Sequence, residues 1–194
     1  AMKIRRRLAE GNPAAYEPDL ARSLSNLGIR LAEAGRQGEA LTAEQEAMKI
    51  YRRLAEGNPA AYEPDLARSL SNLGIWLAEA GRRGQALTAA EEAVKIYRRL
   101  AEGNPAAYEP DLATSLAVFA MLPAAEGDLS MALRAAEEAV ELYRRYVATV
   151  PSVLPRLRAV LGVQADLFEV LGREEEAEAV RRWLSENPLP PGFS

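Results

Sequence analysis

Residues 8–21 read LAEGNPAAYEPDLA, and the same fourteen letters return at 54–67 and again at 100–113. Each copy begins 46 residues after the one before it. Self-similarity at a fixed period of roughly 20–50 residues is the mark of a repeat architecture. The chain of 194 residues is therefore an array of similar units. Such an array is stabilised by stacking of neighbours instead of one central core.

The stretch that follows the second proline of this phrase predicts the first helix of each unit. In PDLARSLSNLGIRLAEAG (18–35), leucines recur in steps of four, three and four, which is one stripe of a helix. They are Leu20, Leu24, Leu27 and Leu31. Gly35 is expected to end the helix, because glycine adopts positive φ without steric cost.

The stretch GEALTAEQEAMKIYRRLAEG (38–57) predicts the second helix. Its apolar stripe comprises Ala40, Ala43, Ala47, Ile50 and Leu54, and Gly57 is expected to end it. The first two copies of the unit differ at six positions, among them Arg30/Trp76 and Glu44/Ala90.

The repeated phrase joins one helix pair to the next. Gly11 is expected to end a helix, and Asn12-Pro13 to turn the chain. Pro18 fits the first turn of the following helix, where its missing N–H costs nothing. Two prolines five residues apart are not expected inside one regular helix, so AAYE (14–17) is predicted to be a short turn of its own.

Composition excludes several classes of function. The net charge is −4, which argues against a general nucleic-acid or anionic-membrane binder. The chain has no His and no Cys, so it lacks the usual zinc ligands, thiolate nucleophiles and catalytic triads. We therefore expect no enzyme activity, no cofactor and no metal site. The lack of Cys suits a cytoplasmic location.

The register of the repeats predicts the organisation of the chain. It begins at the equivalent of Ala47, in the middle of a second helix, which suggests the C-terminal piece of a longer array; a family member that starts with a lone helix is the alternative. The expected parts are a half-repeat at 1–12, units at 13–58, 59–104 and 105–150, a degraded helix pair at 151–186 and a polar tail at 187–194.

The spacing of Leu24, Leu27, Gly28 and Leu31, followed by Ala40 and Ala47, resembles the tetratricopeptide repeat (TPR). EPDLARSLSNLG is also similar to the HPDVA-SLNNLA joint of the kinesin-light-chain type. The resemblance implies an all-α, right-handed α-solenoid of antiparallel helix pairs. It also implies a concave face, lined by the first helices, that binds peptide segments of other proteins, often in regulatory or scaffolding arms of larger bacterial proteins.

Carrying the family's groove positions over residue by residue gives the candidate binding residues. The first unit contributes Arg22, Ser25, Asn26, Ile29 and Glu33, and the second contributes Arg68, Ser71, Asn72, Ile75 and Glu79. An Asn offers both a donor and an acceptor, so a row of them can hold an extended peptide backbone. The alternative is that these are ordinary solvated positions of a duplicated unit.

The third unit departs from the other two. Val118 and Met121 make its candidate groove apolar, and Pro123 falls deep in the first helix, where it is expected to kink or end that helix. One hypothesis is an apolar pocket for a partner's side chain. The other, which the sequence favours, is drift in a near-terminal repeat, with Val118 and Met121 covered by the fourth unit.

Trp76 stands where the first unit has Arg30, and the sequence leaves two roles open for it. It is either a binding anchor or a packing residue against the adjoining helix pair.

A second open question is the function as a whole. Besides protein binding, the array is a candidate spacer or self-association module, because the first helix exposes Ile4 and Leu8 to a second copy.

Overall fold

The computed structural model describes residues 2–122 and 129–189 of the chain. Over these ranges the regular secondary structure is helical, without a β-strand. The α-helices are α1 (Met2–Gly11), α2 (Pro13–Glu33), α3 (Gln37–Gly57), α4 (Pro59–Glu79), α5 (Arg83–Gly103), α6 (Pro105–Met121), α7 (Leu129–Tyr146), α8 (Leu154–Val170) and α9 (Glu174–Glu186), with a 3-10 turn, η2 (Pro151–Val153), before α8. The all-α fold predicted from the repeats is confirmed.

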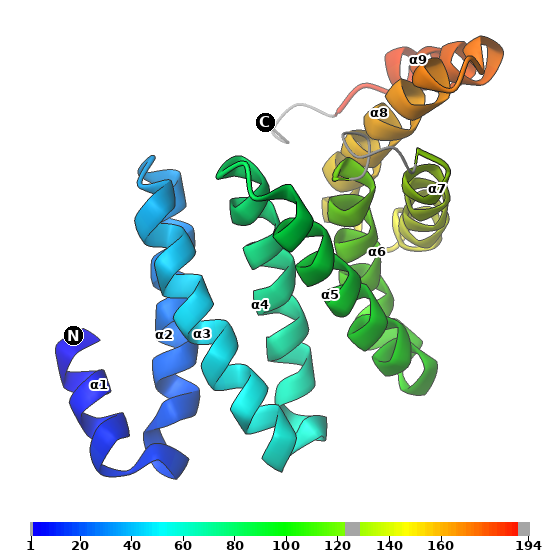
Figure 1. Cartoon of the computed structure of the whole chain (residues 1–194). Helices are drawn as coiled ribbons and strands as arrows, with labels where there is room; N and C mark the ends of the chain where they lie inside the picture. Colours follow the sequence, from blue (N-terminus) through cyan, green and yellow to red (C-terminus); the bar gives the residue numbers. More distant parts are fainter. Residues whose placement is uncertain (1, 123–128, 190–194) are drawn as a thin grey trace. The chain divides into compact units, whose positions relative to one another are not determined.

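The chain divides into two compact units, residues 1–96 and 97–194, and the division falls within α5. In the first unit α1 packs on α2, α2 on α3 and α3 on α4. Successive helices run in opposite directions (Figure 1). Every interior helix is therefore covered on two sides by its sequence neighbours, which is the arrangement of a helical-repeat solenoid.

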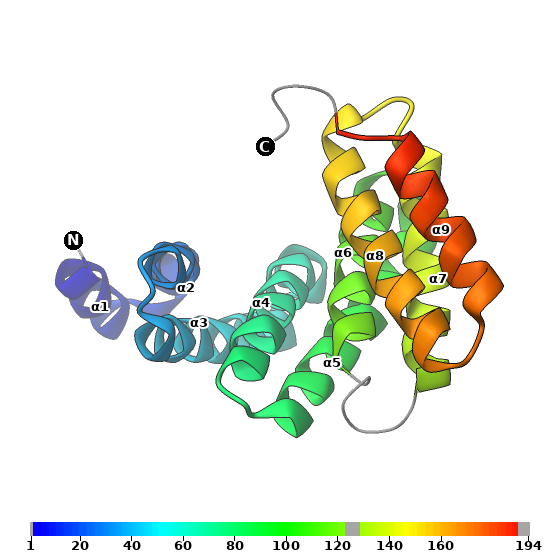
Figure 2. The ribbon, with the colours of Figure 1, turned by 90° about the horizontal axis from the view of Figure 1, so that it is seen from above.

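The second unit repeats this order with more divergent sequences. Here α6 packs on α7, α7 on α8 and α8 on α9. Figure 2 shows α8 and α9 side by side. Gly172, between them, has a φ of 72°, as Gly35 (74°) and Gly81 (72°) have after α2 and α4. The prediction that Gly35 ends the first helix through positive φ is confirmed.

The leucine and alanine stripes predicted from the sequence form the core. Leu24, Ala40 and Ala47 are fully buried between neighbouring helices, whereas Leu27 and Leu54 are half-buried. The alanines of α3 let the helix axes approach closely, and the leucines of α2 fill the space that remains. Since the same stripes recur in α4 and α5, the same packing rule is used in successive repeats.

The predicted break at AAYE is wrong, because α2 runs without interruption from Pro13 through Pro18 to Glu33. Pro13 is at the first position of the helix, and the Asn12 side chain caps it by accepting a hydrogen bond from the Ala15 N–H (3.3 Å). Only Pro18 is interior, and it removes a single backbone hydrogen bond near the helix start. A single lost bond is tolerated because the rest of α2 is held by packing.

Pro123, where the sequence predicts that the helix kinks or ends, lies outside the described residues. Helix α6 extends from Pro105 to Met121, with Leu122 as its C-terminal cap. Its earlier proline, Pro110, is inside the helix in the same way as Pro18 in α2.

Candidate binding face

The exposed residues of α2 and α4 form matching rows in the first unit. Ile29 and Ile75, which are equivalent in the two repeats, are both exposed although they are large and apolar. Along α2 the exposed row continues through Arg22, Asn26 and Glu33. On α4, Asn72 is half-buried and Glu79 is exposed. We call the following residues of α2 and α4 the A-helix face: Arg22, Asn26, Ile29, Glu33, Arg68, Asn72, Ile75 and Glu79.

The two arginines of this face have partners within their own helices. Arg22 forms an ion pair with Asp19, and Arg68 forms the equivalent pair with Asp65. Both pairs have i,i+3 spacing, and the arginine side chains are more than half exposed. Exposed pairs of this kind contribute at most about 1 kcal/mol. Each of these two ion pairs is therefore weak on its own.

Four of the candidate residues are packed inside the array. They are Ser25, Ser71, Trp76 and Val118, all of them buried. Trp76 lies over α2, because a Cβ placed on Gly28 would be 2.9 Å from the Trp76 Cη2 atom. Of the two roles left open for Trp76, the structure shows packing against the adjoining helix pair. The accessible part of the candidate set therefore consists of the remaining residues.

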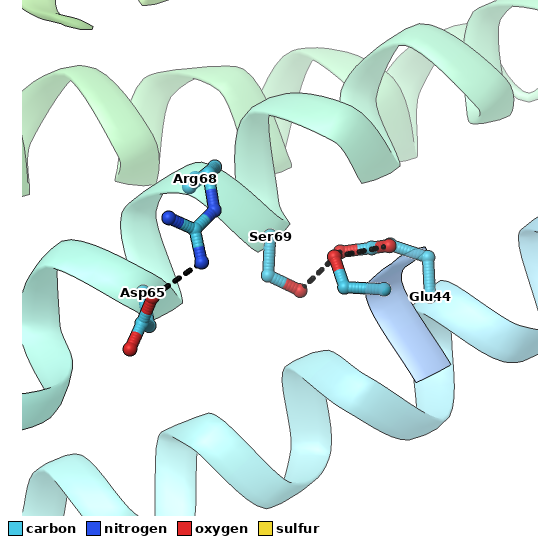
Figure 3. A network of polar contacts seen from close by, with 5 residues as sticks. Glu44, Asp65, Arg68 and Ser69 are labelled. Carbon is cyan, nitrogen blue, oxygen red and sulfur yellow. Dashed lines mark hydrogen bonds and ion pairs between the residues drawn. The ribbon is translucent and has the colours of Figure 1, made fainter. Parts of the chain in front are cut away.

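Ser25 is engaged in a buried polar cluster that the sequence analysis did not identify. Glu44, on α3, is fully buried, and its carboxylate accepts hydrogen bonds from Ser25 Oγ (2.9 and 3.0 Å) and from Ser69 Oγ (2.6 Å). Figure 3 shows Ser69 beside this carboxylate and the Asp65–Arg68 pair one turn away. The cluster connects α2, α3 and α4 through one acid.

A signal for this cluster was present in the sequence. Glu44 lies four residues after Ala40 and three before Ala47, and thus on the alanine stripe of α3, where the second unit has Ala90. A charged residue on a buried stripe needs polar partners from neighbouring helices. The repeat pattern does not reveal them, because Ser25 and Ser69 occupy different positions in successive repeats.

Burial dominates the electrostatics of the cluster. It raises the pKa of the Glu44 carboxyl, while the hydrogen bonds from Ser69 and Ser25 and the charge of Arg68 act in the opposite direction. Burial likewise raises the pKa of Tyr51 to about 12, with Asp65 adding to the shift. Because both groups are enclosed by protein, neither is placed to exchange protons with a bound substrate.

In the second unit the two candidate residues on α6 differ in exposure. Val118 is buried and Met121 is exposed. One turn before Val118, the Thr114 hydroxyl is 2.9 Å from the Tyr143 hydroxyl of α7 and also donates to the Pro110 carbonyl (3.0 Å). This side of α6 is therefore used for packing on α7, and Met121 is the accessible candidate at its end.

In the part of the chain that the structure describes, no group of three or more acidic residues is placed to hold a metal ion. Within the same residues, no helix combines the length and apolar character needed to cross a bilayer.

Comparison with known proteins supports the fold and the repeat type. The family model described as tetratricopeptide repeat matches residues 20–59 and 66–105. Among curated protein sequences, no relative matches the chain.

Three solved structures share the fold at low sequence identity. A putative kinesin light chain from Podosopora anserina with nearly identical TPR-like repeats has 18% identity and a TM-score of 0.64, covering 93% of this chain and 82% of that one. BtubC (BKLC) from P. vanneervenii has 16% identity and a TM-score of 0.56, covering 100% and 91%. MamA has 13% identity and a TM-score of 0.57, covering 93% and 82%.

The family model, the 46-residue period and the helix pairs agree with one another. The TPR fold is in general a scaffold for protein interaction, without catalytic function of its own. Residues 20–59 and 66–105 are therefore matched as tetratricopeptide repeats, and the solved structures share the helical-repeat fold over nearly the whole chain.

Proposed function

We propose that this protein is a non-catalytic interaction scaffold that binds a peptide segment of a partner protein along the A-helix face. The observation that supports the proposal is the exposure of the equivalent residues Ile29 and Ile75, each flanked by polar residues of the same row. Two apolar side chains left exposed at the same position of successive repeats favour a ligand that is itself extended along the array.

Each residue of the face has a role in this proposal. Asn26 and Asn72 offer an amide donor and a carbonyl acceptor to the peptide backbone, whatever its side chains. Ile29 and Ile75 contact apolar side chains of the ligand. Arg22 pairs with an acidic group of the ligand after releasing Asp19. The ligand expected from this chemistry is an extended segment with alternating apolar and acidic residues.

The proposal is tested by selecting ligands from a random peptide-display library with the full chain as bait. Binding of the selected peptides is then measured for Asn26→Ala combined with Asn72→Ala. We expect roughly tenfold weaker binding, since each lost backbone contact is worth about 0.5–1.5 kcal/mol. Helix content and melting temperature should stay unchanged, because neither side chain is in the core.

Gln37→Ala is the matched control, because it removes an exposed amide side chain from the start of α3 without touching the A-helix face. Its binding should equal that of the unchanged protein. Selected peptides that bind the double Asn variant as tightly as the unchanged protein would contradict the assignment of the face.

A further inference from the structure

Tyr51 of α3 is a buried aromatic residue whose hydroxyl group is left without a partner. Only 2% of the residue is exposed, in the layer where α3 packs on α2 and α4. Within residues 2–122 and 129–189, no group forms a hydrogen bond with this hydroxyl. No fully enclosed side-chain oxygen or nitrogen of the same residues lacks a partner, so the Tyr51 oxygen must reach the surface. Because a buried tyrosine usually pairs its hydroxyl, an unpaired one indicates a place for a ligand atom.

The Tyr51 hydroxyl reaches the surface among charged groups of the A-helix face. Arg22 of α2 and Arg68 of α4 both act on it, as does Asp65, the ion-pair partner of Arg68. The two arginines come from the two helices that carry the face. Each asparagine of the face follows one of these arginines by four residues, which is about one helical turn. The hydroxyl therefore opens between the two rows of the face, near their asparagines.

The second unit shows what the equivalent hydroxyl does when an acceptor is present. Tyr143 of α7 is the equivalent of Tyr51, and its oxygen is 2.9 Å from the Thr114 hydroxyl of α6. Thr114 gives its one hydrogen to the Pro110 carbonyl (3.0 Å), so Tyr143 is the donor of the pair. In the first unit Arg22 stands in the place of Thr114. Since a guanidinium has donors only, it offers no acceptor to the hydrogen of Tyr51.

The acceptor that suits the Tyr51 hydroxyl is uncharged. Burial raises the pKa of Tyr51 to about 12, so the oxygen keeps its proton and remains a donor. Both neighbouring arginines are balanced by an aspartate of their own helix. Asp65 acts on Tyr51 more strongly than either arginine does, which disfavours a second carboxylate beside it. A main-chain carbonyl accepts without a charge, and every extended peptide offers one.

We propose that the Tyr51 hydroxyl donates a hydrogen bond to a main-chain carbonyl of the ligand, where the extended segment passes between Arg22 and Arg68. This contact rests on the proposed function and adds a third backbone contact to those of Asn26 and Asn72. It comes from a second helix, whereas the other residues of the face lie on first helices. The carbonyls of a helical ligand are engaged in its own hydrogen bonds, so the contact favours an extended one.

The probe is the tightest-binding peptide from the display selection, labelled with fluorescein, and its binding to the full chain is followed by fluorescence anisotropy. Tyr51→Phe removes the oxygen and keeps the buried ring. We expect about three- to tenfold weaker binding, because one hydrogen bond to the ligand is lost. The urea midpoint should stay unchanged, because no group of the described protein is bonded to the hydroxyl.

Tyr143→Phe is the matched control, because it makes the same change at the equivalent position of the second unit. It should lower the urea midpoint, since it removes the hydrogen bond to Thr114. Its peptide binding should equal that of the unchanged protein. The two variants thus separate a hydroxyl that binds the ligand from one that supports the fold.

A backbone scan of the peptide identifies the carbonyl. Each amide is replaced in turn by an ester, which weakens the carbonyl as an acceptor and removes the N–H. At one position the ester should weaken binding to the unchanged protein more than binding to Tyr51→Phe. The loss of the N–H is the same for both proteins and cancels in this comparison.

Two results would overturn the Tyr51 contact while the proposed function stands. One is binding that the double Asn variant weakens and Tyr51→Phe does not. The other is coupling of Tyr51→Phe to the replacement of an acidic side chain of the peptide by its amide, which would assign the hydroxyl to a carboxylate. A library that yields no peptide, or peptides indifferent to the double Asn change, would contradict the proposed function and the Tyr51 contact together.

Discussion

Glu44 shows what one buried acid does to a helical repeat. Its carboxylate is enclosed by α2, α3 and α4 and is satisfied by two serine hydroxyls. The charge of Arg68 on α4 acts on this carboxyl, and Glu44 in turn acts on Tyr51 of the same helix, as do Asp65, Arg68 and Arg22. Hydrogen bonds reduce the cost of burying the charge without cancelling it, because burial still raises the pKa of Glu44.

The sign of the pH dependence follows from this shift. The folded protein holds the Glu44 proton up to a higher pH than the unfolded chain does. Below the pKa of the unfolded chain both states are protonated, and the residue imposes no charge penalty. As the pH rises from there through the raised pKa of the folded state, stability is lost.

Glu44→Gln should therefore stabilise the protein at pH 7.5, by about 1–2 kcal/mol, because it keeps the shape and removes the buried charge. The gain should shrink as the pH is lowered toward the pKa of a free glutamate. Urea unfolding of both proteins at several pH values between 4.5 and 7.5 measures it. Glu46→Gln is the control. Glu46 lies on the same helix as Glu44, but it pairs with Arg6 of α1 at the surface. A stabilisation that is constant over the pH range would contradict the mechanism.

At the scale of helices, the equivalent glycines Gly28 and Gly74 have different surroundings. A Cβ on Gly28 would lie 2.9 and 3.0 Å from two ring atoms of Trp76 and 3.3 Å from the Ala40 carbonyl oxygen. On Gly74 the nearest atom would be the Ala86 carbonyl oxygen, at 3.4 Å. The close approach of Trp76 on α4 to α2 thus requires glycine at position 28, whereas Gly74, which faces α5, leaves room for a methyl group.

Gly28→Ala should destabilise the protein by about 1–3 kcal/mol through overpacking. Gly74→Ala should be neutral or stabilise it by up to about 1 kcal/mol, because alanine favours helix. Thermal unfolding of the two variants side by side measures the difference. Trp76→Leu combined with Gly28→Ala should recover part of the loss. Equal effects of the two alanine substitutions would show that the indole ring does not limit the approach.

The two prolines of α2 allow a second comparison between equivalent changes. Pro18→Ala restores the N–H that can donate to the Ala14 carbonyl, so it should raise stability by about 1–3 kcal/mol. Pro13→Ala should have little effect, because the first helical position has no backbone bond to gain. Urea unfolding distinguishes the two. A gain at Pro13 as large as that at Pro18 would mean that the backbone bond is not the cause.

The same helix shows how far the sequence predicts local structure. The leucine stripe and Gly35 set the buried face and the end of α2 correctly, because both act through local geometry. The continuity through Pro18 was not predicted, because it depends on contacts made elsewhere. Glu17, one residue before that proline, is held by Arg53 of α3, so tertiary packing fixes the turn that the proline weakens.

The candidate face was predicted in part for a similar reason. Ile29 and Ile75 are exposed as the family pattern implies, and whether they bind a ligand stays a prediction. Ser25 and Trp76 were placed on the same face, but Glu44 and Gly28, from other helices, draw them into the packing. A pattern read along one helix does not report such contacts between helices.

At the scale of the molecule, nearly identical helices occupy different surroundings. The segments 1–11 and 47–57 differ at one position, Arg5/Tyr51, so their unprotected amides exchange at similar rates. Helix α3 is covered on two sides and α1 on one. Amides of α1 should therefore exchange at least about tenfold faster than their equivalents in α3. Hydrogen exchange read by mass spectrometry tests this, and equal protection of the two segments would contradict it.

Ion pairs that span 40 residues recur along the chain: Arg6–Glu46, Arg52–Glu92 and Arg98–Glu138. Each joins a residue of one second helix to the next second helix. Removing residues 47–92 would join Glu46 to Ala93 and leave the first and third of these pairs intact. The protein can thus be shortened or lengthened by whole repeats with each surviving ion pair of this kind still formed. The number of repeats is therefore not fixed by these ion pairs.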